Sequence, residues 1–142
     1  QVYKDDEKKI NIIAGKFKGK EGPVKNHNIS PVYFDVEIEK GKKFNFELSP
    51  THNSLIYLIE GEIKVGEENH KQAKNSKLII LTKGRKLEVS GLTKAKFLLI
   101  SGKPIGEIIA RGGPFVMNTK EEILKAVEDY HSGNFVKKWQ KL

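Results

Sequence analysis

The segment GKKFNFELSPTHNSLIYLIEGEIKVG, residues 41–66, constrains the fold most, because it holds two strand patterns separated by a turn. In the first pattern Phe44, Phe46 and Leu48 alternate with polar residues, which is the period of a half-buried strand. Pro50 ends that strand, since proline has no backbone N–H to donate to a neighbour. A glycine turn at Gly61 closes the second strand, so we expect antiparallel pairing in this region.

Short strands and turns recur along the rest of the chain. A first strand is predicted near Ile10–Phe17, and Val32–Ile38 alternates apolar and polar side chains. Further turns are expected at Gly66, Lys83-Gly84, Gly91 and Gly102. Short strands about 8–15 residues apart favour an all-β barrel or sandwich. The lack of helical patterns between them excludes a parallel sheet with crossover helices.

Three runs, Leu55–Ile59, Leu78–Leu81 and Phe97–Ile100, are apolar on both faces of the strands that they predict. A strand of a small single barrel turns one face to water, so a continuous apolar run indicates a strand covered on both sides. We expect the C-terminal segment or a second barrel to cover the outer face. Ile56 and Leu58 are the residues that we predict for this interface.

One helix is predicted near the C-terminus. Thr119 can cap it, and Glu122 three residues later completes a capping box. Gly133 is expected to end the helix. Its apolar stripe, at spacings of three and four, consists of Ile123, Leu124, Val127 and Tyr130.

Length and composition indicate one folded domain in a reducing compartment. The 142 residues suffice for a single core, and the absence of cysteine excludes disulfides and thiolate metal sites. With no apolar run long enough to span a bilayer and no leader-like start, we expect a soluble, cytoplasmic protein. We divide the chain into an N-terminal arm or linker (1–10), a β-barrel (11–118) and a C-terminal helix with its tail (119–142).

The net charge of +8 comes almost entirely from lysine, because Arg85 and Arg111 are the only arginines. Specific nucleic-acid recognition favours the bidentate arginine side chain, and the lysines are scattered rather than clustered. A solvated basic surface is therefore the favoured interpretation, and we do not expect nucleic acid as a partner.

Three blocks of the sequence make a family resemblance specific. They are IIAGKFKGKEGPV (12–24), HNSLIYLIEGEIKVG (52–66) and SGKPIGEIIARGGPFVMNTKEEILKAVEDYHSGNF (101–135). In this order and spacing they resemble the C-terminal half of a pirin. The resemblance implies a cupin-type double-stranded β-barrel, jelly-roll-like, with one C-terminal α-helix. It also implies that the family's metal ligands, three His and one Glu, lie in the other, N-terminal half.

Positions where a cupin would carry metal ligands hold a poor donor set in this chain. They are occupied by Glu47, Ser49 and Asn53, with His52 beside them. A metal ion needs three or four converging donors, so we expect no metal, no other cofactor and no catalytic residue here. A polar ligand pocket at the barrel mouth remains a hypothesis, lined by Ser49, His52, Asn53 and Tyr57. The alternative is a filled barrel in which His52 only bonds the turn backbone.

A second group of residues is predicted to have a structural role, the anchoring of the terminal helix to the barrel. A glycine pair frees the backbone there, a proline stiffens the turn, and large apolar side chains can fill a core. The group consists of Arg111, Gly113, Pro114, Phe115, Met117 and Asn118. Ser101 and Ser132 are predicted to lack a base partner, which argues against nucleophilic catalysis.

The leading hypothesis is a metal-free, pirin-like C-terminal cupin domain with a structural or partner-binding role. Its expected partner is a second cupin domain, either a homodimer mate or a separate N-terminal pirin half. The enzymatic alternative is a subunit of a split metal-dependent dioxygenase of the quercetinase type, whose metal site lies on the other half. A stand-alone barrel that binds a small polar ligand is a third possibility.

Overall fold

The computed structural model describes residues 1–25, 28–67 and 71–136. It divides into two compact units, Gln1–Ile105 and Gly106–Leu142, which are described separately below. Residues 106–118, which the sequence analysis assigned to the barrel, group with the helix instead. The end of the predicted tail, from residue 137, lies outside the described residues.

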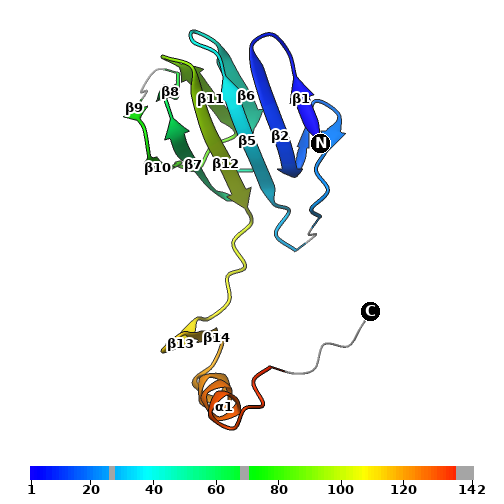
Figure 1. Ribbon diagram of the computed structural model, residues 1–142, viewed down its shortest axis with the longest axis vertical. Helices are drawn as coiled ribbons and strands as arrows, with labels where there is room; N and C mark the ends of the chain where they lie inside the picture. Colours follow the sequence, from blue (N-terminus) through cyan, green and yellow to red (C-terminus); the bar gives the residue numbers. More distant parts are fainter. Residues whose placement is uncertain (26–27, 68–70, 137–142) are drawn as a thin grey trace. The chain divides into compact units, whose positions relative to one another are not determined.

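Unit 1 consists of two facing antiparallel sheets (Figure 1). The six-stranded sheet contains, in spatial order, β1 (Val2–Lys4), β2 (Lys8–Ala14), β5 (Val32–Ile38), β12 (Ala95–Gly102), β7 (Asn53–Glu60) and β10 (Lys77–Ile80). The four-stranded sheet contains β6 (Lys43–Glu47), β11 (Lys86–Gly91), β8 (Glu62–Val65) and β9 (Lys71–Lys74). A short hairpin joins β3 (Lys16–Phe17) to β4 (Lys20–Glu21). The predicted all-β class is confirmed, although the two sheets do not close into a true barrel.

The core between the sheets follows the predicted alternation. In β5, Phe34, Val36 and Ile38 are at most 1% exposed, as the period of two requires. Phe44 of β6 faces Phe97 of β12 edge to face, with ring centroids 5.7 Å apart. Such aromatic pairs add to the free energy gained by burying their large apolar area.

Strands β7 and β12 are neighbours inside the six-stranded sheet and carry apolar residues on both faces. Ile56 and Leu58 point into the core and are fully buried. Their prediction as interface residues is therefore wrong, because alternation places them on the inner face. The residues on the outer face of β7 are Tyr57 and Ile59, 39% and 37% exposed, together with the half-buried Leu55.

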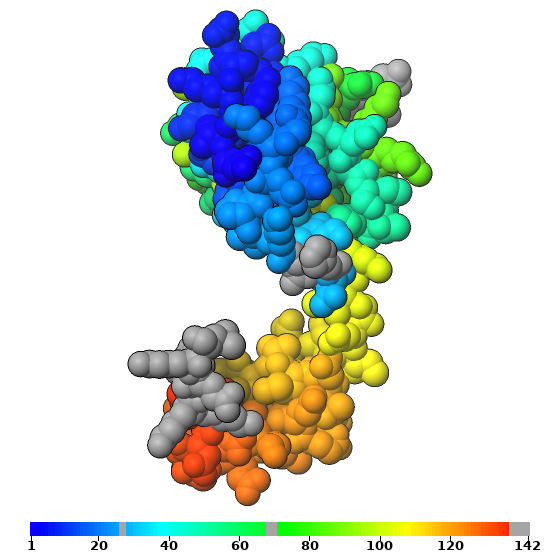
Figure 2. All heavy atoms as spheres, turned by 90° about the vertical axis from the view of Figure 1, so that its right-hand side faces the viewer, coloured from blue at the N-terminus to red at the C-terminus, as the bar shows by residue number. Residues whose placement is uncertain are grey.

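The N-terminal residues are not a free arm, which corrects that prediction. β1 pairs with β2, so that Tyr3 lies opposite Ile10. Figure 2 shows the N-terminal segment on the surface of unit 1. The turn between the two strands is organised by Asp5, whose Oδ1 accepts hydrogen bonds from the backbone N–H groups of Glu7 and Lys8 at 2.9 and 2.8 Å.

The turn predicted at Gly61 is confirmed and connects β7 to β8. Gly61 has φ +84°, a conformation that L side chains rarely adopt. A Cβ there would also collide with the carbonyl oxygen of Lys94. Both constraints explain why glycine occupies this turn.

Unit 2 consists of a hairpin and one helix. β13 (Ala110–Gly112) pairs with β14 (Phe115–Met117), and α1 (Lys120–His131) follows. The predicted capping box is confirmed, since the Thr119 hydroxyl accepts from the Glu122 N–H. On the helix, Ile123 and Ala126 are buried within the unit, whereas Leu124 and Tyr130 are exposed. Within the described residues, no helix has the length and apolar character needed to cross a membrane.

Replacing Asp5 with Ala tests the role of the β1–β2 turn. Burial alone would raise the pKa of Asp5, but hydrogen bonds from Tyr3, Glu7 and Lys8 outweigh it and lower the pKa below its ordinary value. When folding lowers the pKa of a carboxyl group, the ionised group stabilises the fold at pH values above its unfolded-state pKa. That stabilisation is lost as the pH falls through the folded-state pKa. We expect Asp5→Ala to lower the free energy of unfolding at pH 7 by about 1 kcal/mol.

Urea denaturation of both proteins between pH 7 and pH 2 measures this effect. The difference between them should shrink as the pH falls from about 4, the unfolded-state pKa of Asp, through the lower folded-state pKa of Asp5. A difference that stays constant down to pH 2 would show that the Asp5 charge does not stabilise the turn.

Candidate functional site

A small hydrogen-bonded cluster lies where β7 begins and β12 ends. Ser54 and Ser101 are paired in the sheet register, and both side chains are buried, at 9% and 3% exposure. Their hydroxyl oxygens are 2.8 Å apart, and His52 Nδ1 is 3.3 Å from Ser101 Oγ. The prediction that Ser101 has no base partner is therefore wrong.

This serine–histidine contact is better suited to a structural role than to catalysis. A nucleophile must meet its substrate, and Ser101 Oγ belongs to a side chain that is only 3% exposed. The cluster instead gives two buried hydroxyl groups the hydrogen-bond partners that burial requires. The sequence alone could not reveal this cluster, because a strand that is apolar on both faces does not show which side is inward.

The four residues predicted to line one pocket do not converge. His52 contacts the buried Ser101, whereas Asn53 and Tyr57 are exposed positions on the alternate face of β7. Ser49 Oγ lies 2.9 Å from Thr51 Oγ1 in the preceding turn. Alternation along the strand separates these side chains, which corrects the pocket hypothesis.

This end of unit 1 does not fit a metal ion. The Lys83 ammonium lies 3.3 Å from Asn53 Oδ1 and from the His52 carbonyl oxygen, so a positive charge already occupies the neighbourhood. In residues 1–25, 28–67 and 71–136 no three His, Cys, Asp or Glu side chains form a group that could hold a metal. The expectation that the chain binds no metal and no other cofactor stays a prediction.

The outer face of the six-stranded sheet carries a continuous apolar surface. Residues directly opposite one another in antiparallel strands share a face, and the register gives two adjacent rows across β10, β7 and β12. The rows are Leu78–Tyr57–Leu98 and Ile80–Leu55–Ile100. We call these six residues the outer apolar face. Ile80 is 79% exposed and Leu78 58%, so water covers much of this surface in unit 1.

Charged residues border the outer apolar face on β5 and β12. Lys96 Nζ lies 3.7 Å from Asp35 Oδ2 and 3.8 Å from Glu37 Oε1. Asp35 Oδ2 also accepts a hydrogen bond from Asn11 Nδ2 at 3.0 Å. Among the described residues, Asp35 Oδ1 is a buried side-chain oxygen without a hydrogen-bond partner. An unpaired buried oxygen costs free energy, because no donor replaces the water that it loses on folding.

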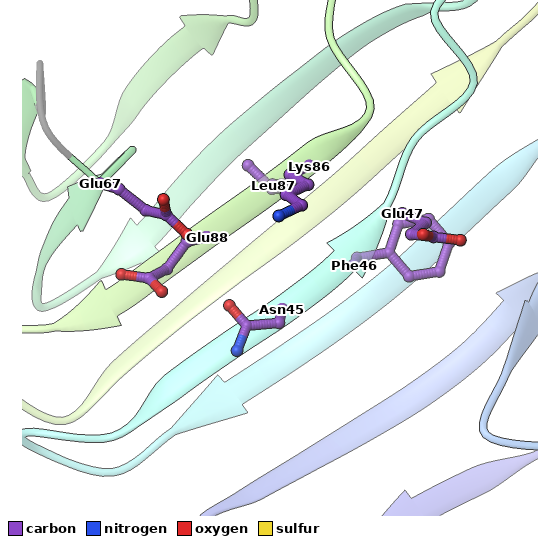
Figure 3. A pocket seen from close by; sticks show the side chains of 7 residues that line it. All are labelled: Asn45, Phe46, Glu47, Glu67, Lys86, Leu87 and Glu88. Carbon is purple, nitrogen blue, oxygen red and sulfur yellow. The ribbon is translucent and has the colours of Figure 1, made fainter.

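A shallow hollow of about 360 Å³ lies beside the four-stranded sheet (Figure 3). Glu67 and Glu88 lie on one side of it and Glu47 on the other, with Lys86 between them. Glu88 is already paired with Lys43 at 2.8 Å. The three carboxylates therefore do not converge on one point.

The predicted structural motif forms the hairpin of unit 2. The Phe115 ring lies 6.1 Å from that of Tyr130 and 5.2 Å from that of Phe135, measured between centroids. Asn118 Nδ2 donates to Glu107 Oε2 and to the Ile108 carbonyl oxygen, both at 2.9 Å. These contacts hold the hairpin and the helix together.

The other members of the motif shape the same hairpin. Arg111 pairs with Val116 and Met117 with Ala110 across the two strands. Gly113, at φ +55°, forms the turn together with Pro114. The predicted attachment of this motif to the barrel stays a prediction.

Residues 33–136 match the model of the Pirin C-terminal cupin domain. A Pseudomonas aeruginosa protein is 33% identical over 129 residues, which cover 88% of this chain and 45% of that protein. A pirin-like protein of Caulobacter vibrioides is 30% identical over 127 residues, covering 89% and 45%. Among solved structures, quercetin 2,3-dioxygenase from Acinetobacter baumannii superposes with a TM-score of 0.81 at 28% identity, covering 93% and 45%. The chain thus spans less than half the length of each of these proteins.

A double-mutant cycle on the two buried serines tests the structural interpretation of their cluster. Ser101→Ala should lower the free energy of unfolding by about 1–2 kcal/mol, because the Ser54 hydroxyl loses its partner. The double variant with Ser54→Ala should cost less than the sum of the two single variants, as urea titrations would show. Additive costs would mean that the two hydroxyl groups do not depend on each other.

Proposed function

Because the chain belongs to the pirin family and matches its C-terminal cupin domain, we propose that it packs against a second cupin domain through the outer apolar face. In this role the chain is a scaffold without a metal site of its own, and it completes a two-cupin assembly. The observation that carries the proposal is a group of six adjacent apolar side chains on β10, β7 and β12, of which four are exposed and two, Leu55 and Leu98, are half-buried. The absence of cysteine suits a cytoplasmic assembly.

A contiguous exposed apolar surface with a polar border is typical of an interaction site. Leu78 and Ile80 lie on β10, the edge strand of the sheet, and Leu98 and Ile100 continue the surface onto β12. Removing such side chains from water contributes about 25 cal/mol for each Å² of apolar area buried. If this face of the sheet stayed in water, its apolar side chains would contribute nothing to the stability of the fold.

The charged border would fix the orientation of the partner. Lys96 and Glu37 lie beside the apolar rows, with Nζ and Oε1 3.8 Å apart and each side chain 33% exposed. Charged groups on the partner could pair with either of them. Polar groups at the rim of an interface contribute mainly to specificity and register.

A second cupin domain is the partner that the relatives favour. Each matched relative named above is about twice as long as this chain, which leaves room in it for another domain of similar size. The family resemblance implies that this other domain carries the metal ligands. A second copy of this chain is the alternative partner, since it would present the same apolar surface.

An enzymatic role for the assembled pair is the second candidate function. The Acinetobacter baumannii structure that resembles this chain is a quercetin 2,3-dioxygenase. If the partner is the metal-bearing half, the pair would be a metal-dependent dioxygenase of that type. In that case this chain would supply support for the active half, not catalytic groups.

Light scattering behind a sizing column tests the docking surface directly. The wild-type chain should form either a dimer or a 1:1 complex with a separately produced metal-bearing pirin half. Ile80→Glu should weaken that association about tenfold or more, because it places a charge in the buried contact. Val24→Glu, a matched change at a residue that is 51% exposed and outside the outer apolar face, should have no effect.

Circular dichroism would verify that both variants are folded. The proposal would be contradicted if the wild-type chain stays monomeric and does not bind the metal-bearing half. Equal association of wild type and Ile80→Glu would contradict it as well.

A further inference from the structure

A second cavity, of about 390 Å³, opens between the two sheets on the side of β10. Its wall is formed by apolar residues from both sheets, namely Leu48, Val65, Ile79, Leu81 and Leu87. All five belong to the hydrophobic core or pack against it. The cavity is therefore an opening into the apolar interior of unit 1, and none of its lining residues belongs to the serine–histidine cluster.

The size and lining of this cavity suit a small organic molecule. Ligand pockets in proteins commonly measure about 300–1,000 Å³ and are mostly apolar, with a few polar groups that orient the ligand. Here the polar groups are at the rim, where Thr82, Lys71, Lys86 and Glu88 contribute to the lining.

Lysines outnumber carboxylates two to one among the residues that line the cavity, which include Lys71, Lys86 and Glu88. Glu88 Oε1 is neutralised by Lys43 at 2.8 Å, and the Glu88 side chain is only 13% exposed. In the part of the chain that the structure describes, neither Lys71 nor Lys86 forms an ion pair. Figure 3 shows Lys86 and Glu88 on β11, where Lys86 lines this cavity as well as the shallow hollow.

We propose that this cavity binds a small amphipathic carboxylic acid, with a compact apolar body between the sheets and its carboxylate at Lys71 and Lys86. Apolar contact with Leu48, Ile79 and Leu81 provides the burial, and the two ammonium groups select an anion over a neutral analogue. This inference does not depend on the proposed docking function, since the outer apolar face shares only Ile80 with the cavity.

Titration of the ¹⁵N-labelled chain with 2-naphthoate, followed by NMR, tests the proposal. The backbone amide signals of residues 79–82 and 84–88 should shift and saturate, while those on the outer face of β12 should not. 2-Naphthalenemethanol, the neutral analogue of similar size, should bind more weakly by a factor of about five or more.

Variants separate the charged rim from the overall charge of the protein. Lys71→Gln combined with Lys86→Gln should weaken 2-naphthoate binding about fivefold and remove the preference over the alcohol. The matched control, Lys40→Gln with Lys125→Gln, changes the net charge equally at residues that do not line the cavity and should leave the affinity unchanged.

Three results would overturn the proposal. One is the absence of saturable shifts around the cavity, and another is equal affinity for the acid and the alcohol. The third is equal weakening by the rim variant and by the control, which would indicate general electrostatic attraction only.

Discussion

The antiparallel pairing of β7 with β12 is the constraint on which the rest of unit 1 depends. Its register places Ile56 opposite Leu99 and Leu58 opposite Phe97 on the inner face, where all four are fully buried. The same register brings Tyr57 opposite Leu98 on the outer face. Because side chains alternate along a strand, a slip of one residue would exchange the two faces. The core and the outer apolar face are thus two results of one pairing.

In the part of the chain that the structure describes, this end of unit 1 has no group of side chains that could hold a metal, and its interior is filled by aliphatic and aromatic residues. Ser54 and Ser101, which lie near the place where a cupin would carry metal ligands, bond to each other and to His52. Asn53 is oriented by Lys83 instead of sharing a site with His52. The two candidate binding surfaces are therefore the outer apolar face and the cavity between the sheets beside β10.

Much of this arrangement could be predicted from the sequence, because it depends on local patterns. The alternation in Val32–Ile38, the capping box at Thr119 and the turn at Gly61 are each determined by neighbouring residues. The choice of face for Ile56 could not be predicted in this way. A strand that is apolar on both sides gives no periodic signal, and only its pairing partners show which side is inward. The contact of His52 with Ser101 joins residues 49 positions apart, so no local pattern could reveal it.

Hydroxyl-radical footprinting of the chain, alone and in its assembly, tests the central claim most directly, because it reports the solvent exposure of individual side chains. If the outer apolar face is the docking surface, oxidation of Tyr57 and Ile80 should fall strongly in the assembly, while that of Val24 stays unchanged. If an assembly forms and Tyr57 and Ile80 are oxidised as fast as in the isolated chain, the partner binds elsewhere and the account is wrong.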